Sequence, residues 1–593
     1  MKRVLVAVAL GVLTGCPDRD PVVDAGVPDA GPRVLVDKEP NDQPENAVEV
    51  TGTSVVNGTL SSDPTKPDED WFSLSATDQQ VADLTLGPIP GVDAKLEVLD
   101  VDRNLLVAVN TGGEGKEERL PNLAVRERIF VRVVSAKKGS GGSYTLQIVM
   151  RPAVAGEELE PNDRAVDAID LPFGQSLSAT LAHAGDSDWV RLELPAQEAA
   201  ASTEAPLEQD AGSAELTATD ADAGDAEPQK VPPGQPVVAE PPRSVALKID
   251  LSGIPEVALE VQVLSAAEAP LFTIKGEPGA SLSLRNIGVR ESDRVVYLVI
   301  KSGWTGVGKD AKRGFSPEVP YTLTVTQEEA GANAELEPND EVFKATPLPE
   351  NGFRQGFLSP KTDLDYFVIR PAEPSLIRAQ LSGVDRVDLV LSVIQPASED
   401  GSSPEKVLLR ANDGAIKEPE YLNSIFCAEA CYLKVEAGVR KVAGKWVRDF
   451  ENAEMGYRLA VTSSPDTGAE EREPNGTAEN ATPVGFGGPV RGTVYPKKDS
   501  DLYRLDLTGR PVRTPLRATL LGILKVDVGL YLHRVQEDGS LTLVQTADRA
   551  KGEAPENIRY SAEPGMYVFE VRDSKSRESN FQDSYQLTVE EGE

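Results

Sequence analysis

One motif, repeated along the chain, constrains the fold more than any other feature of the sequence. The tripeptide Glu-Pro-Asn occurs four times, and in every copy an alanine follows its Glu by eight positions. Each copy continues to two aspartates one residue apart, followed by an aromatic residue. The second aspartate follows the motif Glu by 31 residues in the first copy and by 28 in the other three. Such self-similarity predicts four copies of one structural module. The motif glutamates are Glu39, Glu160, Glu337 and Glu473, and the second aspartates are Asp70, Asp188, Asp365 and Asp501.

The later part of each copy alternates between apolar and polar residues. Residues 130–133 and 144–148 in the first copy, and 432–435 and 457–461 in the third, are two such runs, rich in β-branched and aromatic residues. Alternation with a period of two predicts half-buried antiparallel strands. The same two runs are marked by Tyr297 and Tyr321 in copy two and by Tyr567 and Tyr585 in copy four. No amphipathic helix is expected. The chain is therefore predicted to be all-β, a tandem array of four β-sandwich, jelly-roll-like domains on a disordered tether.

Chain length agrees with several domains. A chain of 593 residues exceeds what one hydrophobic core can organise, because domains hold roughly 100–200 residues. We place the four modules at residues 37–151, 157–327, 333–463 and 469–593. The second contains a tract at 196–242 that has few large apolar residues, and we predict that this insertion is disordered.

The first residues have the pattern of an export signal. Lys2 and Arg3 precede an apolar run at 4–13, which is far shorter than the roughly 20 residues that a membrane-spanning helix needs. The run ends in Leu-Thr-Gly-Cys16, which resembles the bacterial lipobox. This resemblance implies a signal peptide at 1–15 and a lipid (palmitate) anchor on Cys16. The residues that follow are rich in Pro, Asp, Ala and Gly and lack periodicity, so we predict a flexible tether at 16–36. It also implies export to the bacterial cell envelope, with the outer membrane or the cell surface expected. The alternative is an ordinary secretory signal that happens to contain a cysteine.

The two remaining cysteines, Cys427 and Cys431, are predicted to form a local disulfide. An oxidising compartment favours this pairing, and the three intervening residues are enough to close the loop. A zinc site is disfavoured because the chain has no further cysteine and only two histidines.

The charge balance restricts the possible partners. The chain carries 60 Lys and Arg against 96 Asp and Glu, a net charge of −36. Such a surface repels nucleic acid and anionic lipid head groups. We therefore expect no nucleic-acid partner, and contact with a membrane only through the lipid anchor. The acidity serves either solubility or a cation, and composition does not separate the two.

The ordered set of motifs resembles a known family. Glu-x-Glu-Pro-Asn-Asp, the alanine, Asp-x-Asp followed by Trp or Tyr, and a closing Tyr-Thr-Leu strand occur in that order. Together they resemble the bacterial pre-peptidase C-terminal domain, a β-sandwich found beside secreted proteases and similar to the collagen-binding modules of bacterial collagenases. The resemblance covers nearly all of the mature chain, in four copies, but no protease domain accompanies them.

Acidic and amide side chains of the motifs are candidate calcium ligands, because calcium takes six to eight oxygen ligands. The proline favours an extended Glu before it, and Asn-Asp favours a turn, so several oxygens can point at one place. In the related collagen-binding modules these positions ligate calcium, so the resemblance implies the same here. The alternative is a purely structural turn and strand start. The candidates are Asp37, Glu39, Asn41, Asp42, Asp68 and Asp70; Glu158, Glu160, Asn162, Asp163, Asp186 and Asp188; Glu335, Glu337, Asn339, Asp340, Asp363 and Asp365; and Glu471, Glu473, Asn475, Asp499 and Asp501. In copy four, Gly476 replaces the last Asp of the motif, which predicts weaker binding.

No catalytic constellation is found, and we expect that the protein is not an enzyme. His183 and His533 are the only histidines, too far apart in sequence for a His-Glu-x-x-His zinc motif, and Gly-x-Ser-x-Gly is absent. We predict a loop position for His183 and a strand position for His533. Four tryptophans are candidate carbohydrate platforms. Trp71 and Trp189 occupy equivalent repeat positions and are predicted to be buried, whereas Trp304 and Trp446 lie in irregular segments that can be exposed.

These features together predict a surface- or periplasm-facing lipoprotein that acts as a binding or adhesive scaffold, with modules stabilised by calcium. The expected partner is a protein or polysaccharide of the cell envelope or matrix. The alternative function is an accessory or targeting factor for an exported protease or another envelope enzyme.

Overall fold

The computed structural model describes residues 31–66, 68–194, 244–290, 293–328, 331, 333–398, 402–549 and 551–592. The predicted signal peptide, Cys16, most of the predicted tether and the insertion at 196–242 lie outside these ranges. Within the described residues, no helix is both long enough and apolar enough to cross a membrane.

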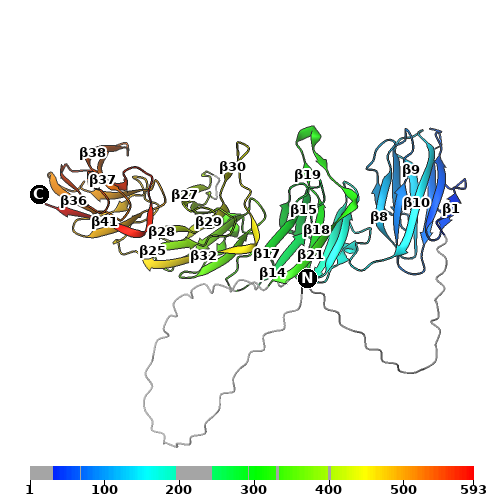
Figure 1. Ribbon diagram of the computed structural model, residues 1–593, viewed down its shortest axis with the longest axis horizontal. Helices are drawn as coiled ribbons and strands as arrows, with labels where there is room; N and C mark the ends of the chain where they lie inside the picture. Colours follow the sequence, from blue (N-terminus) through cyan, green and yellow to red (C-terminus); the bar gives the residue numbers. More distant parts are fainter. Residues whose placement is uncertain are drawn as a thin grey trace, which may run out of the picture. The chain divides into compact units, whose positions relative to one another are not determined.

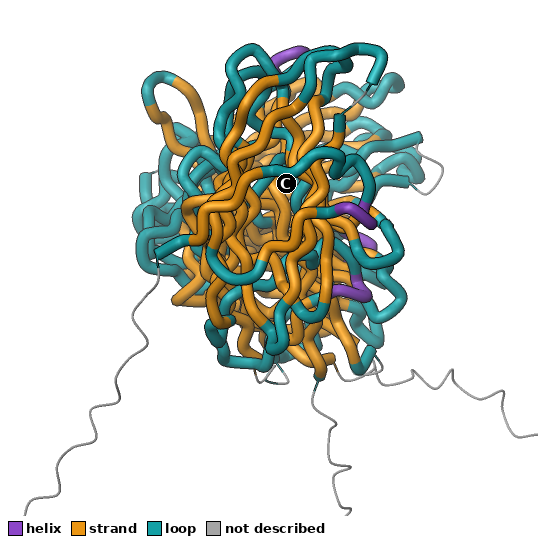
Figure 2. Tube along the Cα trace, turned by 90° about the vertical axis from the view of Figure 1, so that its right-hand side faces the viewer, coloured by secondary structure: helices purple, strands orange, loops and turns teal. Residues whose placement is uncertain are grey.

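The all-β prediction is confirmed. The described strands form four successive pairs of sheets, which we number copies one to four (Figure 1). Helical structure in the described part of the chain is limited to four short 3-10 turns, visible as small purple segments in Figure 2. These are η1 (Pro44–Asn46), η2 (Ala165–Asp167), η3 (Gly308–Asp310) and η4 (Val342–Lys344). The chain divides into two compact units, one of residues 1–119 and 125–152 and the other of residues 120–124 and 153–593.

Copy one contains ten strands in two five-stranded sheets. Their orders are β1-β3-β10-β5-β8 and β2-β4-β9-β6-β7. The strands are β1 (Arg33–Val36), β2 (Val48–Val50), β3 (Ser54–Leu60), β4 (Glu69–Ser75), β5 (Gln80–Leu86), β6 (Ala94–Leu99), β7 (Leu105–Val109), β8 (Glu118–Val125), β9 (Arg128–Ser135) and β10 (Gly142–Pro152). The tether was predicted to reach residue 36, but residues 33–36 form β1. The reason is that the backbone of this short apolar segment pairs in parallel with β3.

Copy two repeats this arrangement without the extra parallel strand. Its sheets have the orders β11-β13-β18-β15-β16 and β12-β21-β14-β17. The strands are β11 (Ile169–Asp170), β12 (Ser176–Leu181), β13 (Ser187–Glu193), β14 (Ser244–Leu251), β15 (Leu259–Leu264), β16 (Pro270–Lys275), β17 (Leu282–Arg290), β18 (Val295–Ser302) and β21 (Ser316–Glu328), with a small hairpin of β19 (Trp304–Thr305) and β20 (Lys312–Arg313). The insertion at 196–242 falls in the connection from β13 to β14.

Copies three and four have the same strand order. In copy three the sheets are β22-β24-β29-β26-β27 and β23-β32-β25-β28, and in copy four β33-β35-β40-β37-β38 and β34-β41-β36-β39. The strands of copy three are β22 (Thr346–Pro347), β23 (Phe353–Leu358), β24 (Leu364–Ile369), β25 (Ser375–Leu381), β26 (Leu389–Gln395), β27 (Lys406–Ala411), β28 (Glu420–Cys427), β29 (Cys431–Ala437), the hairpin β30 (Arg440–Val442) and β31 (Lys445–Val447), and β32 (Asn452–Pro465). Those of copy four are β33 (Thr482–Pro483), β34 (Pro489–Val494), β35 (Ser500–Asp506), β36 (Thr514–Leu521), β37 (Val528–Val535), β38 (Leu541–Ala547), β39 (Glu556–Ala562), β40 (Met566–Asp573) and β41 (Asn580–Glu591).

The cores follow from the alternation seen in the sequence. Successive side chains of a strand point to opposite faces, so every second residue enters the space between the two sheets. In β4, Asp70, Phe72 and Leu74 point inward and are fully buried. Burial of each large apolar side chain contributes about 1.5–3 kcal/mol to folding. The second aspartate of each Asp-x-Asp pair therefore enters an otherwise apolar interior.

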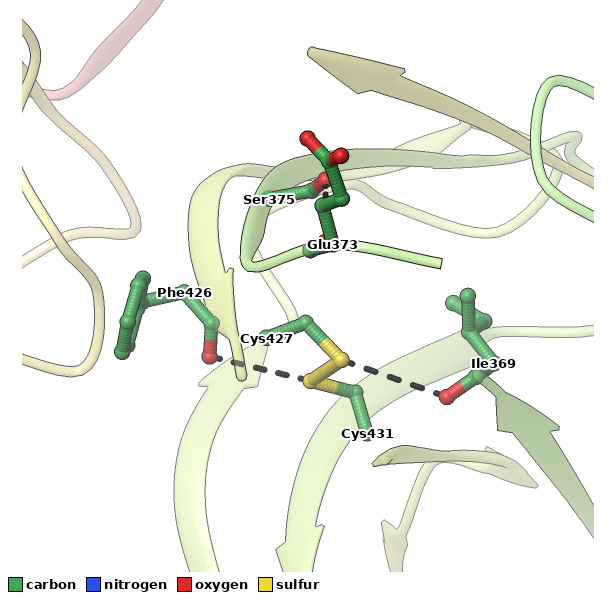
Figure 3. Close-up of a disulfide and its surroundings, with 6 residues drawn as sticks. All are labelled: Ile369, Glu373, Ser375, Phe426, Cys427 and Cys431. Carbon is green, nitrogen blue, oxygen red and sulfur yellow. Dashed lines mark hydrogen bonds between the residues drawn. A yellow bond between two sulfur atoms is a disulfide. The ribbon is translucent and has the colours of Figure 1, made fainter. Parts of the chain in front are cut away.

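The predicted disulfide joins Cys427 to Cys431 in copy three (Figure 3). Cys427 ends β28 and Cys431 begins β29, and these strands belong to different sheets. The bridge thus links the two layers of the sandwich covalently at a tight turn. Cys427 is buried within the core cluster of this copy.

Candidate metal centres

Three segments of each copy build the same acidic cluster. The Glu-Pro-Asn segment precedes the short strand β2, β11, β22 or β33, and its Glu-Pro peptide bond is cis in all four copies. The Asp-x-Asp pair lies at the start of β4, β13, β24 or β35, in one sheet. The third contribution comes from the last strand of the copy, β10, β21, β32 or β41, in the opposite sheet. The cluster therefore lies between the two sheets.

Copy three shows how the cluster is held. Oxygens of Glu335, Glu337 and Asp365 lie within 4.8 Å of one another. The hydroxyl of Tyr457, on β32, lies within hydrogen-bond distance of Asp365, at 2.7 Å, and of Glu335, at 2.8 Å, and it has one proton to share between them. The backbone N–H of Asn339 donates to the Glu337 carboxylate at 2.9 Å. Glu335 also accepts from the Phe357 N–H at 2.6 Å, so neutral donors hold these carboxylates. Among the described residues, no ion pair joins a cationic side chain to Glu335, Glu337 or Asp365 in the way that Arg440 pairs with Asp449.

Copy two leaves more of its oxygens without a donor. Oxygens of Glu158, Glu160 and Asp188 lie within 4.8 Å of one another, and Tyr321 donates to Asp188 at 2.6 Å. Thr180 donates to Glu158 from its backbone at 2.8 Å and from its hydroxyl at 2.7 Å. Five buried oxygens have no hydrogen-bond partner among the described residues: Glu158 Oε2, Glu160 Oε1, Asn162 Oδ1, Asp186 Oδ1 and Asp188 Oδ1. Buried polar atoms normally have partners, so this concentration of free acceptors marks a place that could hold a cation.

Copy one has the same cluster in a more open setting. Oxygens of Asp37, Glu39 and Asp70 lie within 4.8 Å of one another, and so do those of Glu39, Asp42 and Asp68. Tyr144 donates to Asp70 at 2.6 Å. Asp70 is fully buried, but Asp37 is half-buried and Glu39 is exposed.

Copy four retains the inner part of the cluster. Tyr585 donates to Asp501 at 2.7 Å, and Thr493 donates to Glu471 at 2.9 Å from its backbone. Oxygens of Glu473, Asn475 and Asp501 are buried without a partner among the described residues. Gly476 supplies no side chain where the other copies have an aspartate.

Burial and mutual repulsion raise the pKa values of these carboxyls. Burial raises the pKa of Asp70 to about 8 and those of Glu158 and Glu337 to about 7. For the half-buried Asp37, burial and then the neighbouring Glu39 raise the pKa to about 6. The pKa values of Glu160, Asp186, Asp188, Glu335, Asp363, Asp365, Glu471, Asp499 and Asp501 rise well above the usual range, first by burial and then by nearby carboxylates. A bound cation would offset this cost of charging.

The predicted candidates separate into an inner and an outer group. The inner group is the two glutamates, the asparagine and the second aspartate, and the tyrosine donates to the second aspartate in every copy. The outer group holds the neighbouring backbone: Asp163 accepts from Ser187 N–H at 3.0 Å, and Asp363 accepts from Ser359 N–H at 2.8 Å. Asp163 and Asp186 also form a second group with His183. Coordination by any of these residues remains a prediction.

The tyrosines are the site residues that motif reasoning missed. Tyr144, Tyr321, Tyr457 and Tyr585 are buried, and each donates to the second aspartate of its copy. The signal was present, since each begins a Tyr-x-Leu-x-Val or Tyr-x-Leu-x-Ile run. A small residue faces each tyrosine across the sheet: Gly58, Ala179, Gly356 and Gly492. At Gly356, an added Cβ would collide with both the Tyr457 hydroxyl and the Glu335 carboxylate.

The remaining predictions have mixed outcomes. His183 lies in a loop and His533 lies in β37, where it contacts Glu570 at 2.7 Å, as predicted. Trp71 is buried, in a small cluster with Leu99 and Phe130. The prediction that Trp189 is buried is wrong: it is half-buried, on the outer face of its strand beside Tyr297, whereas Trp71 at the equivalent position is covered by Leu99 and Phe130. Trp304 and Trp446 are exposed.

Comparison with known proteins gives likenesses of fold. The structure is similar to the pre-peptidase C-terminal domain of a collagenase from Bacillus anthracis, with 17% identity over 18% of this chain and 94% of that chain and a TM-score of 0.16. It is also similar to the PBSX exported protein XepA, with 11% identity over 40% of this chain and 85% of that chain and a TM-score of 0.14. No protein-family model and no curated protein matches the sequence. We draw no function from these likenesses.

Proposed function

We propose that this protein is a calcium-stabilised, lipid-anchored binding scaffold of the bacterial cell envelope, without catalytic activity. The observation that carries the proposal is the set of five buried oxygens in copy two that have no donor among the described residues. The same cluster recurs in the other three copies. Fourfold repetition suits a cofactor that stabilises each module, because catalysis needs one specialised site.

The donor set favours calcium among the common cations. In copy two, carboxylates and one amide surround the free oxygens, and calcium accepts six to eight oxygens in flexible geometry. Magnesium demands near-ideal octahedral geometry and gives up its water reluctantly. Zinc prefers nitrogen and sulfur ligands, and among the described residues His183 is the one histidine near any of the clusters.

The position of the motif explains how calcium would serve a scaffold. The N–H of Glu337 donates to the carbonyl of Asn286 at 2.9 Å, and its carbonyl accepts from Gly288 N–H at 2.8 Å. Asn286 and Gly288 lie on β17 of copy two, whereas the Glu337 carboxylate lies in the cluster of copy three. The corresponding bonds in copy four join Glu473 to Ser424 and Phe426, each at 2.8 Å. A cation held by these glutamates would therefore stiffen the junctions between modules as well as the modules.

Two measurements test the proposal on the full chain. Titration calorimetry should show several calcium ions per chain, and the unfolding temperature should rise by several degrees in calcium, since binding at a hundredfold excess over Kd contributes about 2.7 kcal/mol. Magnesium should give a smaller shift. No heat of binding and an unchanged unfolding temperature would leave the motif as a structural turn.

The anchor and the partner need separate experiments. Cys16→Ala should release the protein from membranes, and a variant that stays membrane-bound after ordinary signal cleavage would exclude the lipid anchor. Pulldown from envelope extract, with calcium or with chelator, should recover a surface protein or polysaccharide. Recovery of one exported protease would instead support the accessory role.

A further inference from the structure

Two hairpins that the proposed scaffold does not explain project from the sheets of copies two and three (Figure 1). The β19–β20 hairpin presents Trp304, which is 56% exposed, and Val307, which is 86% exposed. The β30–β31 hairpin presents Trp446, 69% exposed, together with Val439 and Val442. Both hairpins connect the strand that pairs with the Asp-x-Asp strand to the tyrosine strand, so they occupy equivalent places in the two copies.

The sandwich itself does not require these hairpins. The corresponding connections are residues 136–141 in copy one and 574–579 in copy four, and neither contains an aromatic residue. In copies two and three the connections lengthen to 303–315 and 438–451, and both lengthened segments contain a tryptophan. Each addition also gathers exposed valines beside its tryptophan, and a group of exposed apolar side chains of this kind, unlike a single one, can mark an interaction site.

The charge of the hairpins opposes that of the chain. The first carries Lys309, Lys312 and Arg313 against a single acidic residue, and the chain as a whole has a net charge of −36. The second carries Arg440, Lys441, Lys445 and Arg448 against two acidic residues, Asp449 and Glu451. Arg440 pairs with Asp449 and Arg448 with Glu436, but none of the four lysines has an ion pair among the described residues. Because the Debye length is about 8 Å at physiological salt, a ligand at the tip senses mainly this local positive charge.

We propose that the two hairpins bind the interfacial region of an anionic lipid bilayer. Indole rings favour the head-group region of a bilayer, and exposed valines beside them bury apolar surface when they enter the boundary between head groups and acyl chains. Lysines nearby attract anionic head groups. An acidic polysaccharide would explain the lysines and the indoles, but it gives no role to the exposed Val307, Val439 and Val442. This contact is independent of the calcium clusters and additional to a lipid on Cys16.

The test uses the full chain carrying Cys16→Ala, so that no lipid contributes, at one fixed calcium concentration. Sedimentation with vesicles of phosphatidylcholine alone is compared with sedimentation with vesicles that also contain phosphatidylglycerol. Brominated phosphatidylglycerol should quench tryptophan fluorescence, and Trp304→Phe with Trp446→Phe should remove the quenching. Binding should require phosphatidylglycerol. Reversal of the four lysines to glutamate should weaken binding by at least about tenfold.

Matched variants distinguish vesicle binding by the two hairpins from nonspecific hydrophobic or electrostatic binding. Lys137→Glu with Lys138→Glu changes exposed lysines in the equivalent turn of copy one, and Phe343→Ser removes a 79% exposed aromatic residue elsewhere. Both should bind vesicles like the parent. The proposal is overturned if they weaken binding as much as the hairpin variants, if binding does not depend on phosphatidylglycerol, or if the chain binds a soluble acidic polysaccharide and no vesicle. Retained unfolding temperatures exclude misfolding as the cause.

Discussion

Copies one and three carry the same motif but differ in how deeply they bury it. In both, a tyrosine of the last strand donates to the second aspartate, at 2.6 Å in copy one and 2.7 Å in copy three. Yet Glu39 of copy one is exposed, whereas Glu337 of copy three is 6% exposed. Glu337 lies against Asn286 of copy two. The tyrosine–aspartate pair is thus a property of the sandwich, and the burial of the motif glutamate in copy three accompanies its contact with the preceding module.

The largest expected effect comes from neutralising the inner aspartate of copy three. Asp365→Asn keeps the shape of the side chain but removes a charge that burial and nearby carboxylates oppose. In chelator we expect the variant to unfold at a higher temperature than the parent, because the neutral amide avoids the cost of charging a buried carboxyl beside other carboxylates. In calcium we expect the reverse, because a ligand is lost. Calorimetric unfolding of the full chain in chelator and in calcium measures whether the effect on the unfolding temperature changes sign.

The same change in copy one sharpens the comparison. Asp70→Asn should also raise the unfolding temperature in chelator and lower it in calcium, but both changes should be smaller, since water reaches Asp37 and Glu39. Glu373→Gln is the control, because this exposed residue near the disulfide lies outside the motif (Figure 3). Glu373→Gln should leave the unfolding temperature unchanged both in chelator and in calcium. If Asp365→Asn lowered stability both with and without calcium, the cluster would be a structural network rather than a cation site.

Removing the tyrosine hydroxyl should have the next largest effect. Tyr457→Phe removes the hydroxyl that contacts Asp365 and Glu335, although Glu335 still accepts from the Phe357 N–H at 2.6 Å, and the expected cost is about 1–3 kcal/mol. Among the described residues, Tyr144 has one hydrogen-bond partner, Asp70, so Tyr144→Phe should cost less. The midpoints of thermal unfolding give both values. Equal losses would show that the second bond in copy three contributes little.

Stability without calcium should fall as pH rises. Folding raises the pKa of Glu337 to about 7 and that of Asp70 to about 8, above their unfolded values. The folded state then binds more protons than the unfolded state, so stability decreases with pH from roughly pH 4 to pH 8. Calcium should flatten or reverse this slope, because it competes with protons for the same oxygens. Unfolding midpoints across this range, in chelator and in calcium, check the sign; a rising curve in chelator would contradict it.

The repeat, the strands and the members of the cluster could be predicted from the sequence because each depends on residues that lie close together along the chain. Fixed spacing from Glu337 to Asp365 places both in one module, and alternation assigns the inward face. The tyrosines could not be placed in the site in the same way, since Tyr457 lies 92 residues after Asp365 and meets it only across two sheets. Alternation indicates that such a residue is buried, but not what it contacts.

Two other features depended on longer-range structure. The segment 33–36 is too short to stand out from its Pro- and Gly-containing surroundings, and it becomes a strand only because the edge of β3 accepts it. The few cationic residues of the hairpins are outnumbered in the net charge of −36. For this reason the net charge predicts no direct membrane contact. The significance of the hairpins comes from exposure at equivalent places in two copies, which the sequence alone does not show.

The smallest expected effect is a gain in copy four. Copies two and three have Asp163 and Asp340 where copy four has Gly476, and Gly476 does not have a left-handed backbone. An added Cβ there would meet only the carbonyl oxygen of Ser500, at 3.6 Å, which is an ordinary contact. Gly476→Asp should therefore fit and add a carboxylate beside Asp499.

We expect Gly476→Asp to tighten calcium binding at copy four by about tenfold, or roughly 1.4 kcal/mol. Titration calorimetry of the full chain should show the weakest site shifting toward the others, with the number of ions unchanged. Gly485→Asp adds the same charge in the same copy at an exposed glycine with open space around it, and it should leave the isotherm unchanged. Equal tightening by both variants would mean that added negative charge alone is sufficient. In that case the last aspartate of the motif would have no specific part in distinguishing copies two and three from copy four.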